Sequence, residues 1–144
     1  MIEKKYDDFA FSIPDEWVDR TIVSFSAPVG KKSKFAPNIV VTKDILDDIK
    51  PMEEYVDKQL VDLASQMEKF NLLKRNKITI DSLSAVELSY TWSGTNGTIQ
   101  QSQVFVIVGK KMITFTATSF KDDFPLVAPV FQMIANSMKF PSNR

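Results

Sequence analysis

The chain has 144 residues, with 18 basic and 18 acidic side chains and neither His nor Cys. This length and an apolar content of 44% are typical of one soluble globular domain, so residues 1–144 are treated as a single domain. The lack of Cys excludes disulfides and thiolate chemistry, and the lack of His removes the commonest general base and transition-metal ligand. Zero formal net charge also disfavours nucleic acid as a partner, because phosphate binding requires an excess of positive charge.

The first third of the sequence has the pattern of short strands. Residues 9–13 alternate aromatic or aliphatic residues with small ones, and a proline turn follows. A second β-rich run covers Thr21 to Ser26. A third covers Asn38 to Thr42 and contains three successive β-branched residues, which predicts a strand covered on both faces.

Two amphipathic helices are predicted. The first runs from Met52 to about Phe70, because Pro51 can precede a first turn and apolar residues recur at spacings of four and three. The second runs from about Pro129 to Met138. The carboxylate pairs Asp47-Asp48 and Asp122-Asp123 flank the helix starts, so we interpret them as capping or dipole partners and not as metal ligands.

The region between the helices predicts a meander of antiparallel strands. Strands are expected at Leu73 to Ile80, around Val86 to Trp92, at Ile99 to Val108 and at Met112 to Thr118. The dipeptide Asn96-Gly97 is a hairpin signal between the second and third of these. Short connections require antiparallel pairing, so the predicted fold class is α+β, a twisted antiparallel sheet with the helices packed mainly on one face.

No catalytic or cofactor-binding motif is present. The sequence lacks G-x-S-x-G, a Walker loop, G-x-G-x-x-G and any His-based pair, so no enzyme activity, cofactor or metal is predicted. The N-terminus lacks the apolar stretch of a secretory signal, and no window resembles a membrane span. The one basic run, Lys31, Lys32 and Lys34, is interpreted as a solvated loop. We therefore expect a cytoplasmic protein that does not insert into membranes.

One predicted sheet face mixes aliphatic residues with Gln and Thr. Gln101 and Gln103 alternate along one strand with Phe105, and hydroxyl side chains alternate along the next. Such a face suits a ligand that is mostly apolar and carries small polar groups. A second layer of core, or a partly hydrated sheet face, would produce the same pattern.

Five stretches, in the same order along the chain, resemble signatures of the DcrB-like family, which belongs to the PsbP-like fold superfamily. They are Phe11 to Thr21 (FSIPDEWVDRT), Pro37 to Asp44 (PNIVVTKD), Tyr55 to Leu60 (YVDKQL), Ala85 to Trp92 (AVELSYTW) and Gln101 to Phe105 (QSQVF). The resemblance covers nearly the whole chain.

Members of this family without a signal sequence resemble the chaperones encoded beside Rhs-type effectors of type VI secretion. The resemblance implies a homodimer with a concave apolar cleft that holds the N-terminal transmembrane helices of an effector until loading. It also implies that Gln59 and Gln103 are polar positions of the cleft, which we interpret as hydrogen-bond donors to the client. The expected client-binding residues are Ile22, Ser24, Val40, Gln59, Gln101, Gln103, Phe105, Thr114 and Thr116.

Three alternatives stay open at this stage. Gln59 flanks the apolar stripe of the first helix, so it could be an ordinary half-buried flank position. The chain could be an envelope-associated protein like the lipoprotein branch of the family, although that branch carries an export signal and a lipidated Cys. An enzyme site on the Gln and Thr face is the third. The chain also departs from the family pattern at Ser82, where a Gly turn is expected, and at Ser24, where an aliphatic residue is usual.

Overall fold

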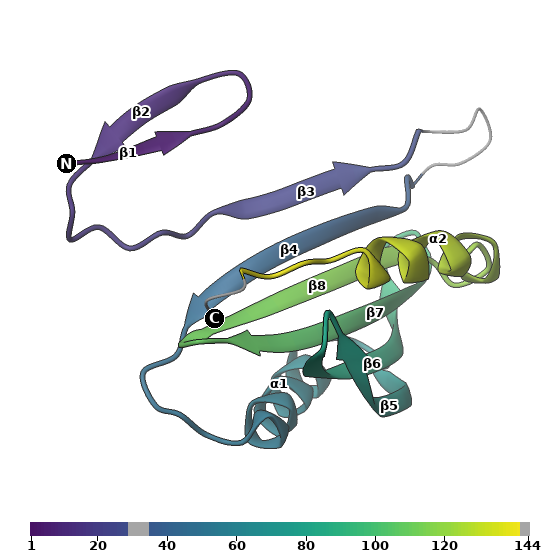
Figure 1. Ribbon diagram of the computed structural model, residues 1–144. Helices are drawn as coiled ribbons and strands as arrows, with labels where there is room; N and C mark the ends of the chain where they lie inside the picture. Colours follow the sequence, from purple (N-terminus) through teal and green to yellow (C-terminus); the bar gives the residue numbers. More distant parts are fainter. Residues whose placement is uncertain (29–34, 142–144) are drawn as a thin grey trace.

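The computed structural model describes residues 1–28 and 35–141, so the loop predicted at Lys31, Lys32 and Lys34 lies outside the described residues. The predicted α+β class with antiparallel pairing is confirmed (Figure 1). In chain order the elements are β1 (Ile2–Lys5), β2 (Ala10–Ile13), β3 (Ile22–Ser26), β4 (Asn38–Ile45), α1 (Met52–Gln66), β5 (Asn71–Ile80), β6 (Leu83–Gly94), β7 (Gly97–Val108), β8 (Lys111–Phe120) and α2 (Phe124–Asn136).

Six strands form one antiparallel sheet in the order β3-β4-β8-β7-β6-β5, and β1 pairs with β2 in a separate hairpin. Strands β5 to β8 are the predicted meander, joined by tight turns. The turn between β5 and β6 places Asp81 and Ser82 at φ values of 48° and 67°, the left-handed conformation that a two-residue hairpin turn requires. Ser82 therefore occupies a position that favours glycine, which is the residue the family pattern led us to expect there.

The two helices cover opposite faces of the sheet, so the prediction that they pack mainly on one face is wrong (Figure 1). Helix α1 packs Val56 and Leu63 against one face of β6 and β7. Helix α2 packs Phe131 and Ala135 against the other face. The reason is that the central strands are apolar on both sides: along β7, Phe105 belongs to the α1 cluster, while its neighbours Val104 and Val106 belong to the α2 cluster.

Helix boundaries differ from the predicted ones for local reasons. Helix α1 ends at Gln66 because Met67 is extended, but Phe70 still packs against Tyr90, with ring centroids 5.2 Å apart and the rings tilted by 41°. The apolar stripe thus continues beyond the helix that it predicted. Helix α2 begins at Phe124 and includes Pro129. Asp123 occupies the N-cap position of α2, but its carboxylate accepts no capping hydrogen bond, so the capping role expected of that pair is not seen there.

The N-terminal part of the chain contributes strands but little core. Strand β1 was not predicted from the sequence, and it pairs only with β2 among the described strands. Every residue of β3 is exposed. The predicted coverage of both faces of β4 is also not found, because this strand is only half-buried: Ile39 and Val41 pack on the α2 cluster, while Val40 faces the other way.

A groove of apolar and hydroxyl side chains beside helix α1

Strand register brings the predicted face together. Residues directly opposite each other in antiparallel strands share a face, so each cross-strand row contributes neighbouring side chains to one surface. Three rows run across β3, β4, β8, β7 and β6 on the face that α1 covers. The rows are, in that strand order, Ile22, Thr42, Thr114, Phe105 and Val86; Ser24, Val40, Thr116, Gln103 and Leu88; and Ser26, Asn38, Thr118, Gln101 and Tyr90.

Helix α1 covers only one end of these rows. It packs on Val86, Leu88 and Tyr90 of β6, which are almost fully buried, while Ile22 at the β3 end is 66% exposed. The surface between these ends forms a hollow of about 370 Å³, with β4, β7 and β8 as its floor and α1 as one wall. Its lining residues are Thr42, Asp44, Leu46, Tyr55, Gln59, Gln103, Phe105, Met112, Thr114 and Thr116, which we call the groove.

Polar side chains on the groove face bond mainly to one another. The Trp92 indole Nε1–H donates to Gln101 Oε1 at 3.1 Å, and Gln101 Nε2 donates to Thr118 Oγ1 at 2.9 Å. In the next row, Gln103 Nε2 donates to Thr116 Oγ1 at 3.1 Å. Both the oxygen and the nitrogen of the Gln101 amide, and the nitrogen of the Gln103 amide, thus have hydrogen-bond partners within the sheet.

The Gln103 carbonyl is the exception. Gln103 is 6% exposed, and its Oε1 is buried with no hydrogen-bond partner among the described residues. A buried acceptor without a partner costs about 1–3 kcal/mol, so its presence in the groove requires an explanation. The family resemblance led us to interpret Gln103 as a donor to the client. In the structure one N–H of its amide donates to Thr116, and its Oε1 is an acceptor without a partner among the described residues.

Five of the nine predicted residues line the groove: Gln59, Gln103, Phe105, Thr114 and Thr116. The other four, Ile22, Ser24, Val40 and Gln101, belong to the same face but lie outside the hollow. Phe105 is mainly a core residue of the α1 cluster, at 4% exposed. The apolar and aromatic lining from Leu46, Tyr55 and Met112 was missed, although the helix signature that begins at Tyr55 was noted.

A charged hollow of about 550 Å³ adjoins the groove and shares Thr42 and Asp44 with it. Asp19 lines this hollow, with Lys43 Nζ donating to Asp19 Oδ2 at 2.8 Å and Lys4 Nζ lying 3.4 Å from the same oxygen. The Lys43 hydrogen bond, followed by those from Thr21, holds the pKa of Asp19 well below its usual range. Asp19 therefore links β1 to β4, a role that no sequence motif indicated.

The opposite face carries a smaller polar hollow of about 90 Å³ under α2. Glu87 is 7% exposed there, and Lys74 Nζ lies 2.6 Å from its Oε1. This ion pair satisfies a carboxylate that faces the α2 cluster, so we interpret it as structural. In the described ranges, no group of three or more acidic side chains is placed to hold a metal ion, and neither helix is long and apolar enough to cross a membrane.

The sequence model of the DcrB family matches residues 9–133, so the chain belongs to the DcrB family. Among curated proteins it is similar to Effector EagT6 of Pseudomonas aeruginosa, with 29% identity over 126 residues, which is 88% of this chain and 87% of that protein.

Solved structures give the same picture of the fold. The Protein of Unknown Function PA94 from Pseudomonas aeruginosa superposes with a TM-score of 0.84 at 26% identity, over 98% of this chain and 97% of that one. LpqN of Mycobacterium tuberculosis gives 0.59 at 14% identity over 83% and 82% of the two chains. The PsbP protein of Synechocystis sp. PCC 6803 gives 0.53 at 14% identity over 88% and 96%. The PsbP-like fold is thereby confirmed.

Proposed function

We propose that this protein is a cytoplasmic chaperone that binds and shields the N-terminal transmembrane helices of a Rhs-type effector of type VI secretion, and that it acts as a homodimer. Membership of the DcrB family and the similarity to Effector EagT6 over nearly the whole chain support an effector-associated role. In this proposal the groove is the client-binding surface, and no chemical step is required of it.

The observation that carries this proposal is the composition of the groove floor. Apolar contacts from Phe105 and Met112 lie beside the hydroxyls of Thr114 and Thr116, and the free Gln103 Oε1 lies among them. An apolar helix with a small hydroxyl or amine donor on one side would fill the apolar surface and satisfy this acceptor. A wholly apolar core would not contain an acceptor such as Gln103 Oε1, and a solvated surface would leave it exposed to water.

The dimensions fit a helix laid along the strands. From Met112 to Thr116 the floor of the groove runs about 13 Å along β8, while a transmembrane helix of about 20 residues is about 30 Å long. Covering about 1,000 Å² of apolar helix surface corresponds to roughly 25 kcal/mol of gross transfer free energy, before the costs of association and ordering. One groove is shorter than the client, which is a reason to expect more than one copy around it.

Co-expression tests the proposal. The N-terminal segment of a Rhs-type effector is produced with and without this protein, and the soluble fraction of the segment is measured after centrifugation. We expect the segment to be soluble and to co-purify only when the protein is present. If the segment is equally soluble alone, the chaperone role is wrong.

Two glutamine variants separate client binding from folding. Gln103→Leu removes the free acceptor together with the hydrogen bond to Thr116, and we expect about a 3–10-fold loss of client affinity, corresponding to one hydrogen bond. The loss of stability should be small, because removal of a buried unsatisfied acceptor offsets the lost bond. Gln101→Leu is the matched control on the same strand. Because its amide is satisfied by Trp92 and Thr118, its loss should lower stability and leave client affinity nearly unchanged. Equal client affinities for the two variants would contradict the assigned role of Gln103.

A further inference from the structure

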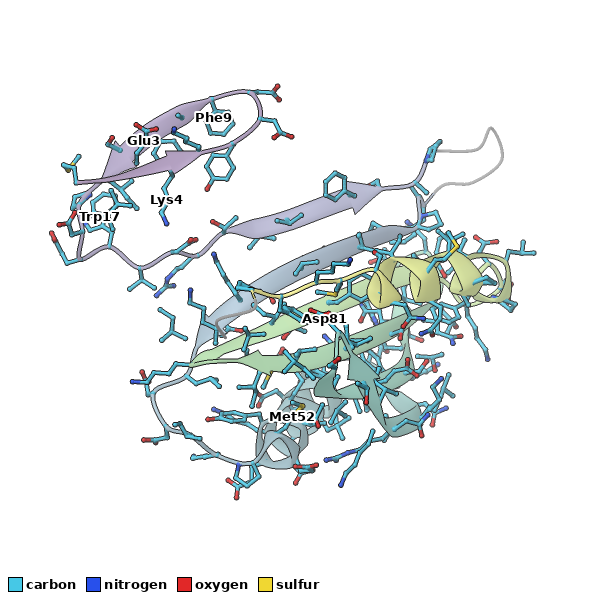
Figure 2. All side chains as sticks on the ribbon, in the orientation of Figure 1. Glu3, Lys4, Phe9, Trp17, Met52 and Asp81 are labelled. Carbon is cyan, nitrogen blue, oxygen red and sulfur yellow. The ribbon has the colours of Figure 1, made fainter. Side chains whose placement is uncertain are left out.

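A single charged side chain lies in a groove that is otherwise uncharged. Of the ten described residues that line the groove, only Asp44 carries a charge. It lies near the end of β4, from which the chain passes to Met52, the first residue of α1 (Figure 2). In the strand register it is opposite Met112 of β8, which in turn is opposite Ile107 of β7. The carboxylate therefore marks one end of an apolar and hydroxyl surface.

The Asp44 carboxylate has no ion pair or hydrogen bond among the described residues. Its chain neighbour Lys43, on the opposite face of β4, donates to Asp19 at 2.8 Å. Arg20 lines the charged hollow together with Asp44 but forms no ion pair with it. The charge on one face of β4 is thus paired, while the charge on the groove face stays open to a partner.

A bound client helix would cover this carboxylate. Asp44 is exposed in the free protein, but a helix of about 30 Å centred on a floor of about 13 Å extends past both ends of the groove. An apolar side chain placed over Asp44 would remove water without supplying a partner, which is unfavourable. A cation at that point would offset the cost. Lys and Arg commonly border transmembrane segments, and their long side chains reach beyond the last apolar turn.

The separation of Asp44 from Gln103 fits half of a transmembrane helix. Gln103 lies in the cross-strand row of Val40, which is about 13 Å from Asp44 along β4. A helix rises about 1.5 Å per residue, so this distance corresponds to about nine residues of a span of about 20. The buried, unpartnered Gln103 Oε1 is an independent sign that the groove receives a ligand. A client whose middle satisfies this acceptor would have its border at Asp44.

We propose that Asp44 determines which segments the groove accepts, by pairing with a Lys or Arg that borders the transmembrane helix of the client. This role rests on the client binding in the proposed function, and it names the chemistry that the groove recognises at one end. A client with an apolar residue there would leave the carboxylate covered and unpaired, and one with an acidic residue would be repelled. The preferred client has its basic residue about nine positions from the centre of the helix.

Competition between two client segments tests this role. One is the N-terminal segment of a Rhs-type effector, and the other is the same segment with the basic residues that border its apolar stretches changed to Asp. Both are co-expressed with the tagged protein, and the ratio retained, relative to the ratio expressed, is measured by mass spectrometry. We expect the natural protein to favour the basic version by about 3–10-fold and Asp44→Lys to favour the acidic version.

Two further variants separate charge from shape and from general electrostatics. Asp44→Asn keeps the shape of the side chain and removes its charge, so the preference should fall below about twofold. Asp47→Lys makes the same change of charge three residues away, at an exposed position that is not part of the groove lining, and should keep the natural preference. Because Asp44 is exposed and unpaired in the described structure, its variants should have an unchanged far-ultraviolet circular dichroism spectrum.

The same retained ratio for the natural protein and Asp44→Lys would overturn the role of Asp44, as would an equal shift for Asp47→Lys. If Asp44→Lys fails to fold, Asp44→Asn decides alone, and a preference as strong as that of the natural protein would overturn the role. Retention of both segments in a ratio that does not depend on position 44 would leave the chaperone role standing. Failure of the natural protein to retain either segment would overturn the chaperone role together with this one.

Discussion

The first 50 residues and the remainder of the chain are similarly apolar, yet only the remainder contains fully buried residues among those described. Every buried residue of the described chain lies between Val56 and Ala135, while β1, β2 and β3 are exposed nearly throughout. Hydrophobic pattern therefore identifies segments that need covering but does not identify what covers them. In the meander the cover is the chain's own helices, whereas residues 1–21, which we call the arm, and β3 leave large apolar side chains exposed.

The largest expected effect separates the two regions by their response to protein concentration. Leu88→Ala removes side-chain volume from the fully buried α1 cluster and should lower the free energy of unfolding by about 2–5 kcal/mol at any concentration. Phe25→Ala, on the exposed β3, should matter little at low concentration and increasingly at high concentration, because it acts through association. Urea unfolding of both variants at two protein concentrations that differ about 100-fold measures the two effects. A concentration-independent effect of Phe25→Ala would break the comparison.

A smaller effect is expected from the ion pair under α2. Lys74→Met leaves the buried Glu87 carboxylate without its partner, and we expect a loss of about 1–2 kcal/mol, reduced from the fully buried case because Lys74 itself is half exposed. Lys77→Met is the control on the same strand: its pairing with Glu53 at 3.6 Å is exposed, and its loss should change stability by less than about 0.5 kcal/mol. Equal losses in urea unfolding would show that burial of Glu87 does not matter.

The smallest effect concerns Asp19, which ties the arm to the sheet. Its folded-state pKa lies below its ordinary value of about 3.9, so the ionised carboxylate contributes stability above that pH and loses it as the pH falls toward the folded-state pKa. The stability difference between the natural protein and Asp19→Asn should be constant from pH 7 to about pH 5 and should shrink below about pH 4. A difference that stayed constant down to pH 2 would mean that the carboxylate charge is not what holds the arm.

Much of the fold followed from sequence because local patterns determined it. The period-two alternation of the meander, its turn residues and the helical spacing from Val56 to Leu63 each indicate one secondary structure. The face of the sheet on which each helix packs could not be predicted from the sequence. Strand β7 is apolar on both faces, so alternation alone cannot assign a helix to either face. Strand β1 was missed because Ile2 to Lys5 is too polar to indicate a strand without its partner β2.

The sheet face that holds the candidate site could be predicted from the sequence, but the boundaries of the groove on that face could not. Alternation placed Gln101, Gln103 and Phe105 together, and strand register joined them to Thr114 and Thr116. Which part of that face stays open depends on where α1 crosses the sheet, which no local pattern encodes. The unsatisfied acceptor at Gln103 could not be predicted from the sequence either. It depends on which end of the amide faces the Thr116 hydroxyl on the neighbouring strand.

The most direct test of client binding in the groove is a change in thiol accessibility. Gln59→Cys places a thiol on the α1 wall, and Lys58→Cys places one on the neighbouring, outward-facing position of the same helix. Maleimide labelling is followed for both variants with and without the co-expressed effector segment. We predict that the client slows labelling at position 59 by more than about tenfold and leaves position 58 unchanged, since a bound helix excludes reagent only from the groove. Unchanged labelling at position 59, in a complex that keeps the segment soluble, would show that the client binds elsewhere.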